Sequence, residues 1–137
     1  MALGLLAVCS LTLVGSAILL VDTNLGFLFW LGSVLDRAGY TAFPARSVPD
    51  AVELLRELHL KVALLLLNCS LSGAADFIES TRGAQRRLKV IGLVEEEQTP
   101  VTAGVDAVWS RPVEINKETE EQLLKIVHQM LQRSMNA

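Results

Sequence analysis

The sequence predicts an α/β fold, a doubly wound sheet of five parallel strands with helices on both faces. Two observations predict it. Short runs of consecutive apolar residues recur along the chain, and segments with apolar residues at helical spacing separate them. A continuous apolar run is typical of a strand covered on both faces, and its alternation with helices is typical of a doubly wound parallel sheet. The 137 residues are close to the commonest length of a single domain.

The first three elements are strand, helix and strand. Residues 17–21 form an apolar run that ends at an aspartate, and we expect the first strand there. Apolar residues then recur at steps of three and four over residues 27–38, which predicts a helix that Gly39 stops. A shorter strand is expected at residues 40–43.

The second helix has a clear start signal. Ser47 offers a hydroxyl cap, Pro49 suits the first turn, and Asp50 complements the helix dipole. Its expected apolar positions are Val52, Leu55 and Leu58, with Ala51 and Leu54 beside them.

The remaining elements follow in the same alternation. They are strands at residues 62–67, 90–94 and 107–109, helices at residues 75–82 and from residue 116 or 117 onward, and a brief helix before Gly104.

The N-terminal residues need separate treatment because residues 1–21 carry no charge. A membrane span or a secretory signal would explain them, but no basic residue precedes Arg37. If residues 17–21 are a strand, a helix over residues 1–15 would be only about 22 Å long, short of the ~30 Å hydrocarbon core. We therefore predict an apolar extension at residues 1–15 and one domain at residues 16–134, with a membrane anchor as the alternative.

The composition excludes several classes of protein. Hydrophobic residues are 51% and charged residues 20%, which argues against disorder. The net charge of -3 argues against a nucleic-acid partner, which would favour a basic excess. Two cysteines, without a Cys/His cluster, indicate neither a disulfide scaffold nor a metal site.

In a doubly wound sheet the functional site lies at the carboxyl ends of the strands, near the point where the strand order reverses. The residues at four of these ends are Asp22, Asn68, Val94 and Arg111. They are the candidate site residues.

Around these positions the chain resembles the receiver domains of two-component response regulators. The stretches that carry the resemblance are residues 20–24 (LVDTN), 45–55 (ARSVPDAVELL), 66–68 (LLN), 90–94 (VIGLV), 104–108 (GVDAV) and 110–112 (SRP). The resemblance covers all but the N-terminal extension. It implies a flavodoxin-like, receiver-type three-layer sandwich.

The resemblance also implies a chemistry. A working receiver has two acids after its first strand that help to hold Mg²⁺, and an aspartate after its third strand that accepts a phosphoryl group. A Thr or Ser after the fourth strand and a Lys before Pro after the fifth bind the phosphoryl oxygens. Hard oxygen ligands suit Mg²⁺, a carboxylate is the nucleophile, and a cation neutralises developing charge.

This sequence departs from that pattern at most of these positions. Thr23 replaces the second acid, Asn68 replaces the acceptor, Val94 offers no hydroxyl, and Arg111 replaces Lys. An amide forms no acyl phosphate. Arg111 is expected to pair with Asp22, and by resemblance the bond between Arg111 and Pro112 is expected to be cis.

Two further departures concern the output surface. The stretch between Val94 and Arg111 is about five residues short by comparison with the family, so the fourth helix is expected to be clipped. Val108 occupies the position of the aromatic switch residue, and Glu95 is an acid that would point into the site or into solvent.

We therefore predict a degenerate receiver, or pseudo-receiver: a phosphorylation-independent interaction module of bacterial two-component signalling, not an enzyme. We expect no cofactor and no bound Mg²⁺, with Asp22 as a weak candidate ligand. No output domain is expected after the last helix. The predicted partners are other signalling proteins or a second copy, in the cytoplasm, with no nucleic acid. The alternatives are a receiver with residual Mg²⁺-dependent phosphoryl acceptance through another acid, and a membrane-tethered domain.

The first helix carries apolar residues outside its expected core stripe. They are Leu25, Leu28 and Phe29, and we predict that they form an exposed interaction surface. Either residues 1–15 or another chain would cover it.

Overall fold

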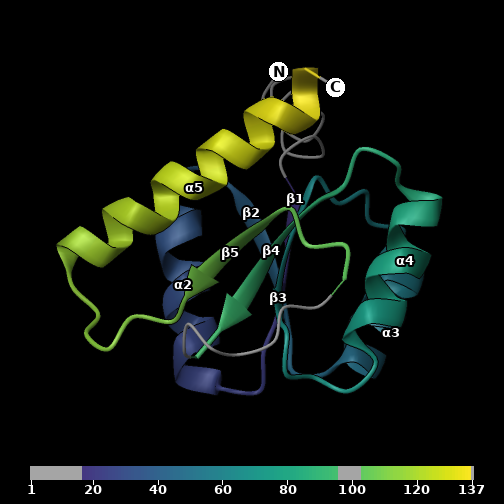
Figure 1. The fold of residues 1–137 in the computed structure, drawn as a ribbon, viewed down its shortest axis with the longest axis horizontal. Coiled ribbons are helices and arrows are strands. Elements are labelled where there is room, and N and C mark those ends of the chain that lie inside the picture. Colours follow the sequence, from purple (N-terminus) through teal and green to yellow (C-terminus); the bar gives the residue numbers. More distant parts are fainter. Residues whose placement is uncertain (1–16, 96–102, 137) are drawn as a thin grey trace, which may run out of the picture.

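The predicted strands form one parallel sheet in the computed structural model, which describes residues 17–95 and 103–136 (Figure 1). The strands are β1 (Ala17–Val21), β2 (Thr41–Ala45), β3 (Leu64–Asn68), β4 (Lys89–Val94) and β5 (Ala107–Ser110). Their order is β2-β1-β3-β4-β5, and all neighbours are parallel. The chain winds outward from β1 to β2 and then returns to β3, so the order reverses between β1 and β3. This confirms the predicted doubly wound sheet.

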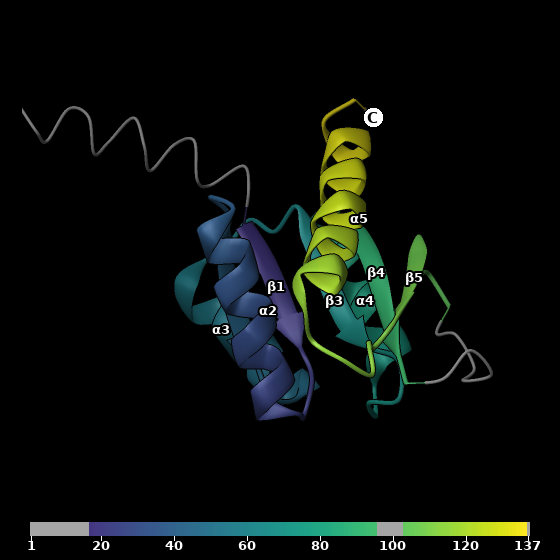
Figure 2. The same ribbon diagram turned by 90° about the vertical axis from the view of Figure 1, so that its left-hand side faces the viewer.

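Helices cover both faces of the sheet. The described residues contain four of them: α2 (Leu25–Arg37), α3 (Val48–Leu58), α4 (Ala74–Ala84) and α5 (Lys117–Asn136). Figure 2 looks onto one face, with α2 and α5 in front of the sheet and α3 and α4 behind it. The brief helix expected before Gly104 falls mainly on residues 96–102, outside the described residues, and so does the extension at residues 1–15.

Each face of the sheet has its own hydrophobic core. On one face Ile18, Leu66 and Ile91 pack against α2 and α5, and on the other Leu19, Leu65 and Val90 pack against α3 and α4. Every residue of β1 and β3 is buried, as a central parallel strand requires. Each fully buried Leu or Ile contributes about 1.5–3 kcal/mol through removal from water.

Side-chain caps set where two of the helices begin. Asn24 Oδ1 accepts a hydrogen bond from the Phe27 amide at 3.0 Å, and α2 therefore begins at Leu25, two residues before the predicted start. Ser47 Oγ accepts a hydrogen bond from the Asp50 amide at 3.1 Å, which confirms the predicted cap of α3.

The predicted apolar face of α3 is wrong in part. Ala51 is buried, and Leu54 and Leu55 pack beside it, but Val52 is 45% and Leu58 50% exposed. Val52 lies about 100° round the helix from Ala51 and so points away from the sheet. Leu58 is the last residue of the helix.

The expected cis bond between Arg111 and Pro112 is also wrong, since no peptide bond among the described residues is cis. The trans form of an X–Pro bond is lower in free energy by about 0.5–1 kcal/mol. In this form the Arg111 amide donates to the Val94 carbonyl at 2.7 Å and its guanidinium reaches Asp22.

Candidate functional site

The carboxyl ends of β1 and β3 bring two predicted site residues together at the reversal of strand order. Val21 pairs with Leu67 in the sheet, so Asp22 and Asn68 follow side by side. Asp22 is fully buried and Asn68 is 6% exposed. Arg111 reaches the same place from the end of β5, whose arrow points to this edge in Figure 1.

Hydrogen-bond donors surround the Asp22 carboxylate. Oδ1 accepts from the Asn24 amide at 2.9 Å, from Asn68 Nδ2 at 3.4 Å and from an Arg111 guanidinium nitrogen at 3.2 Å. Oδ2 accepts from the same guanidinium nitrogen at 2.9 Å. The predicted pairing of Arg111 with Asp22 is therefore present, and it compensates a negative charge that would otherwise be buried alone.

Asn68 acts as a bridge between two backbone segments. Its Nδ2 donates to Asp22, and its Oδ1 accepts from the Ser70 amide at 2.8 Å. Both ends of the amide therefore hold the loop after β3 against the end of β1. An amide at this position has no nucleophilic oxygen that could form an acyl phosphate.

The Arg111 guanidinium lies between two acids and an aromatic ring. Its second terminal nitrogen is 3.3 Å from Glu95 Oε1, and its central carbon is 4.8 Å from the centre of the Phe27 ring. A cation over an aromatic face gains about 0.5–2 kcal/mol, depending on its desolvation. Arg111 Nε is buried and has no hydrogen-bond partner in the described structure. The contact with the Phe27 ring offsets part of the free energy that is lost when Nε is buried without a hydrogen-bond partner.

Phe27 belongs to a cluster of three stacked rings beside the site. Its ring centre is 5.9 Å from Trp30 and 6.4 Å from Trp109, and the two Trp rings are 6.3 Å apart. Trp109 packs half-buried against the core, and it fixes the end of β5 from which Arg111 extends.

The other predicted site residues take no part in this network. The Thr23 side chain is exposed, the buried side chain of Val94 has no polar group, and Pro112 is half-buried after Arg111. Sequence reasoning assigned no site role to Asn24 and Phe27. The cap signal at Asn24 was visible in the sequence, whereas no local pattern places Phe27 beneath a guanidinium.

The donor set does not suit a divalent cation. The Asp22 oxygens already accept hydrogen bonds from an amide N–H, a side-chain amide and a guanidinium, and Asn68 turns its oxygen away toward Ser70. Mg²⁺ needs several hard oxygen ligands at one point. Within the described residues no group of three or more His, Cys, Asp or Glu side chains is placed to hold a metal.

Two of the three residues of the predicted interaction surface are exposed, and the third is buried. Leu25 is 55% and Phe29 78% exposed, but Leu28 is 4% exposed and belongs to the core. The buried face of α2 is wider than the apolar stripe that the sequence predicted. Leu28 forms its margin on the side next to β2. In the described part of the chain, no helix is both long and apolar enough to cross a membrane.

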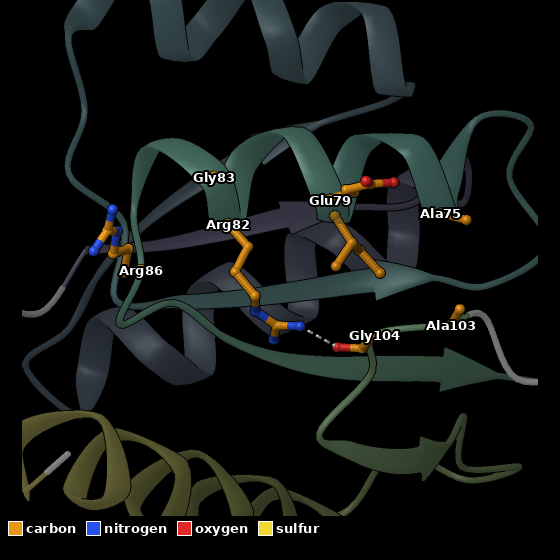
Figure 3. Close-up of a pocket in the computed structure, with 8 residues that line it drawn as sticks. Ala75, Glu79, Arg82, Gly83, Arg86, Ala103 and Gly104 are labelled. Carbon is orange, nitrogen blue, oxygen red and sulfur yellow. Dashed lines mark hydrogen bonds between the residues drawn. The ribbon is translucent and has the colours of Figure 1, made fainter.

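A second feature lies on the opposite side of the sheet, where α4 meets the segment before β5. Arg82 Nη1 donates to the Gly104 carbonyl at 2.7 Å (Figure 3). Its Nη2 pairs with Asp106 at 2.7 Å. Asp106 also accepts from the Val90 amide at 2.8 Å. Arg82 therefore ties α4 to the approach to β5 across an open hollow.

Replacing Arg82 with alanine is expected to lower the free energy of unfolding by about 1–2 kcal/mol, because charge-assisted hydrogen bonds are lost from a partly buried position. Arg86 lines the same hollow and is exposed, so Arg86→Ala is the matched control, with an expected change within about 0.5 kcal/mol. Urea unfolding of both variants measures the difference. Equal stabilities would contradict the bridging role of Arg82.

Comparison with solved structures places this arrangement in one fold. The chain is similar to a CheY-like response regulator receiver domain from Methanospirillum hungatei JF-1, with a TM-score of 0.73 and 19% identity over 88% of this chain and 97% of that one. It is equally similar to the signal receiver domain of an HD domain-containing protein from Pseudomonas fluorescens Pf-5, with a TM-score of 0.73 and 20% identity over 88% and 98%. The chain therefore has the receiver fold.

The likeness is one of structure. No protein-family model matches the sequence, and a search of curated proteins finds no match. Asp22, Asn68 and Arg111 are in contact at the carboxyl ends of their strands, the edge of the sheet at which the sequence predicted a site.

Proposed function

We propose that this chain is a degenerate receiver, a signalling module that binds other signalling proteins and does not depend on phosphorylation. The observation that carries the proposal is the ion pair between Arg111 and the fully buried Asp22, with Asn68 beside it. The guanidinium supplies the positive charge that the buried carboxylate requires, and no carboxylate stands at the acceptor position.

The same contacts support a single conformation. A receiver that responds to phosphorylation needs an element that moves between two states. Here Val94 offers no hydroxyl and Val108 replaces an aromatic switch residue, while Arg111 is held by Asp22, Glu95 and Phe27. The proposed activity is therefore binding rather than catalysis, in the cytoplasm and with protein partners.

The first experiment is intact-mass analysis after incubation of the full chain with Mg²⁺ and a small acyl phosphate. We expect no added phosphoryl group on the parent chain. Asn68 presents an amide, and the Asp22 carboxylate is already paired with Arg111. The comparison variant combines Asn68→Asp with Arg111→Lys, which restores the acceptor and the lysine of the family pattern.

A mass increase on the parent chain would contradict the proposal, and peptide mapping would then identify the acid that accepts the group. Glu95 is the first candidate for that alternative, since its carboxylate is 65% exposed and 3.3 Å from Arg111.

A further inference from the structure

The two segments that lead into β3 and β4 carry a cluster of positive charge. Four of the chain's 12 basic residues belong to them, in a protein whose net charge is -3. Lys61, Arg86 and Arg87 are exposed, and Lys89 at the start of β4 is half-buried. We call these four residues the basic edge. Both segments lie at the end of the sheet where the strands begin (Figure 1).

Hydrogen bonds hold the two segments side by side. Gln85 Oε1 accepts from the Val62 amide, and Gln85 Nε2 donates to the Leu60 carbonyl at 3.2 Å. The backbone on both sides of Lys61 is therefore fixed against the residue that precedes Arg86. The cations of the two segments form one surface.

The sequence around the basic edge contains few acidic residues. Residues 58–75 and 80–94 have no Asp or Glu. Glu57 is exposed on the last turn of α3, and Asp106, just before β5, pairs with Arg82 at 2.7 Å. The basic edge therefore carries a local positive charge on a protein whose other parts are net acidic, and it attracts a negatively charged ligand.

Apolar residues accompany this charge. Leu58, at the end of α3, is 50% exposed. The Ala63 amide donates to the Ala17 carbonyl at 3.0 Å, so the chain enters β1 next to the basic edge. Residues 1–16 lie outside the described residues, and their sequence has no charged side chain and five leucines. Basic residues joined to apolar ones are the combination that binds the surface of an anionic membrane.

A membrane fits these observations better than other polyanions. A nucleic acid supplies phosphates but no apolar phase, and the net charge of -3 opposes it. An acidic peptide likewise engages only the cations. A bilayer with anionic phospholipids supplies phosphates for the basic edge and an apolar interior for leucine side chains.

We propose that the basic edge binds the surface of a membrane that contains anionic phospholipids, with the lipid phosphates as its ligands. The contact lies at the opposite end of the strands from Asp22 and Asn68, so it leaves that site open to protein partners. The proposal is independent of the proposed phosphorylation-independent function, and it adds the place at which the module acts.

The test is sedimentation of the full chain with lipid vesicles. We expect binding to vesicles of equal parts phosphatidylcholine and phosphatidylserine, and binding at least about tenfold weaker to phosphatidylcholine alone. Added KCl should weaken the binding because salt screens the attraction. Each basic residue near an anionic surface strengthens binding about fivefold, so Lys61→Glu combined with Arg86→Glu should weaken it at least about 25-fold.

The matched control combines Arg46→Glu with Lys117→Glu. It changes the net charge by the same amount, but Arg46 follows β2 and Lys117 begins α5, away from the basic edge. We expect it to weaken binding less than about twofold, since the attraction falls off within a Debye length. All four substituted side chains are exposed, so both double variants should fold, which circular dichroism checks.

Binding that requires phosphatidylserine, weakens with salt and is lost in the Lys61 and Arg86 variant alone of the two supports the proposal. Four results overturn it: no binding to either kind of vesicle, equal binding to both kinds, equal losses in the two double variants, or release from the vesicles by RNA or polyglutamate at the same concentration of charge. The last result would assign the basic edge to a soluble polyanion.

Discussion

Replacing Arg111 with alanine is expected to lower the free energy of unfolding by about 3 kcal/mol. The substitution leaves the Asp22 carboxylate fully buried without its cation, and only the Asn24 amide and the Asn68 side chain remain as donors. It also removes the guanidinium from the Phe27 ring. Urea unfolding followed by circular dichroism measures the loss.

The matched control is Arg37→Ala. Arg37 pairs with Glu120 at 3.2 Å, but its side chain is 63% exposed, against 21% for Arg111. Exposed pairs contribute about 0–1 kcal/mol because water screens them. If the two alanine variants unfold at the same urea concentration, Arg111 does not neutralise a buried charge and the central feature of the site is misassigned.

A further variant separates the charge from the packing. Asp22→Asn removes the buried charge and leaves Arg111 with Glu95, so we expect a smaller loss than for Arg111→Ala. When both substitutions are combined, the loss should be less than the sum of the single losses, since the two side chains contact each other directly.

Replacing Asn68 with aspartate is expected to have the second large effect, a loss of about 2 kcal/mol near neutral pH. The Asn68 amide nitrogen donates to Asp22 Oδ1 at 3.4 Å, so the substitution exchanges a donor for a second buried carboxylate. The charge repulsion and the burial both favour protonation of the folded state. Stability should therefore fall as the pH rises above about 4, where aspartates of the unfolded chain ionise, and should fall more steeply than in the parent chain.

Mg²⁺ should act on this variant and not on the parent. Two adjacent carboxylates offer the hard oxygen ligands that the parent site lacks, so added Mg²⁺ is expected to raise the melting temperature of Asn68→Asp. KCl at equal ionic strength is the control for screening. A rise in the melting temperature of the parent chain with Mg²⁺ would show that a cation displaces Arg111 from Asp22, and would remove the basis for a metal-independent site.

The amino-acid sequence by itself determined the fold and the position of the site. An apolar run such as residues 64–67 is stable as a strand only when both faces of the strand are buried. The alternation of such runs with helical segments therefore predicts a parallel sheet that is covered by helices on both sides. The polar residues that end β1 and β3 then meet at the reversal of strand order. The pairing of Arg111 with Asp22 could be expected for the same reason.

Other features depended on contacts between residues that are distant in the sequence. Leu25, Leu28 and Phe29 are all apolar, and only the packing of α2 against the sheet buries Leu28 and leaves Phe29 exposed. Likewise Val52 and Leu55 both fit a helical stripe, but the packing of α3 against the sheet leaves Leu55 partly buried and Val52 exposed.

The tertiary structure also decided the details of the site. The Phe27 ring lies beneath the guanidinium because α2 and the end of β5 converge at the same edge of the sheet. The direction in which Asn68 presents its amide follows from the Ser70 N–H beside it. The spacing of apolar residues predicts which side chains are buried. The orientation of a buried polar group depends instead on the hydrogen-bond donors and acceptors that the fold places beside it.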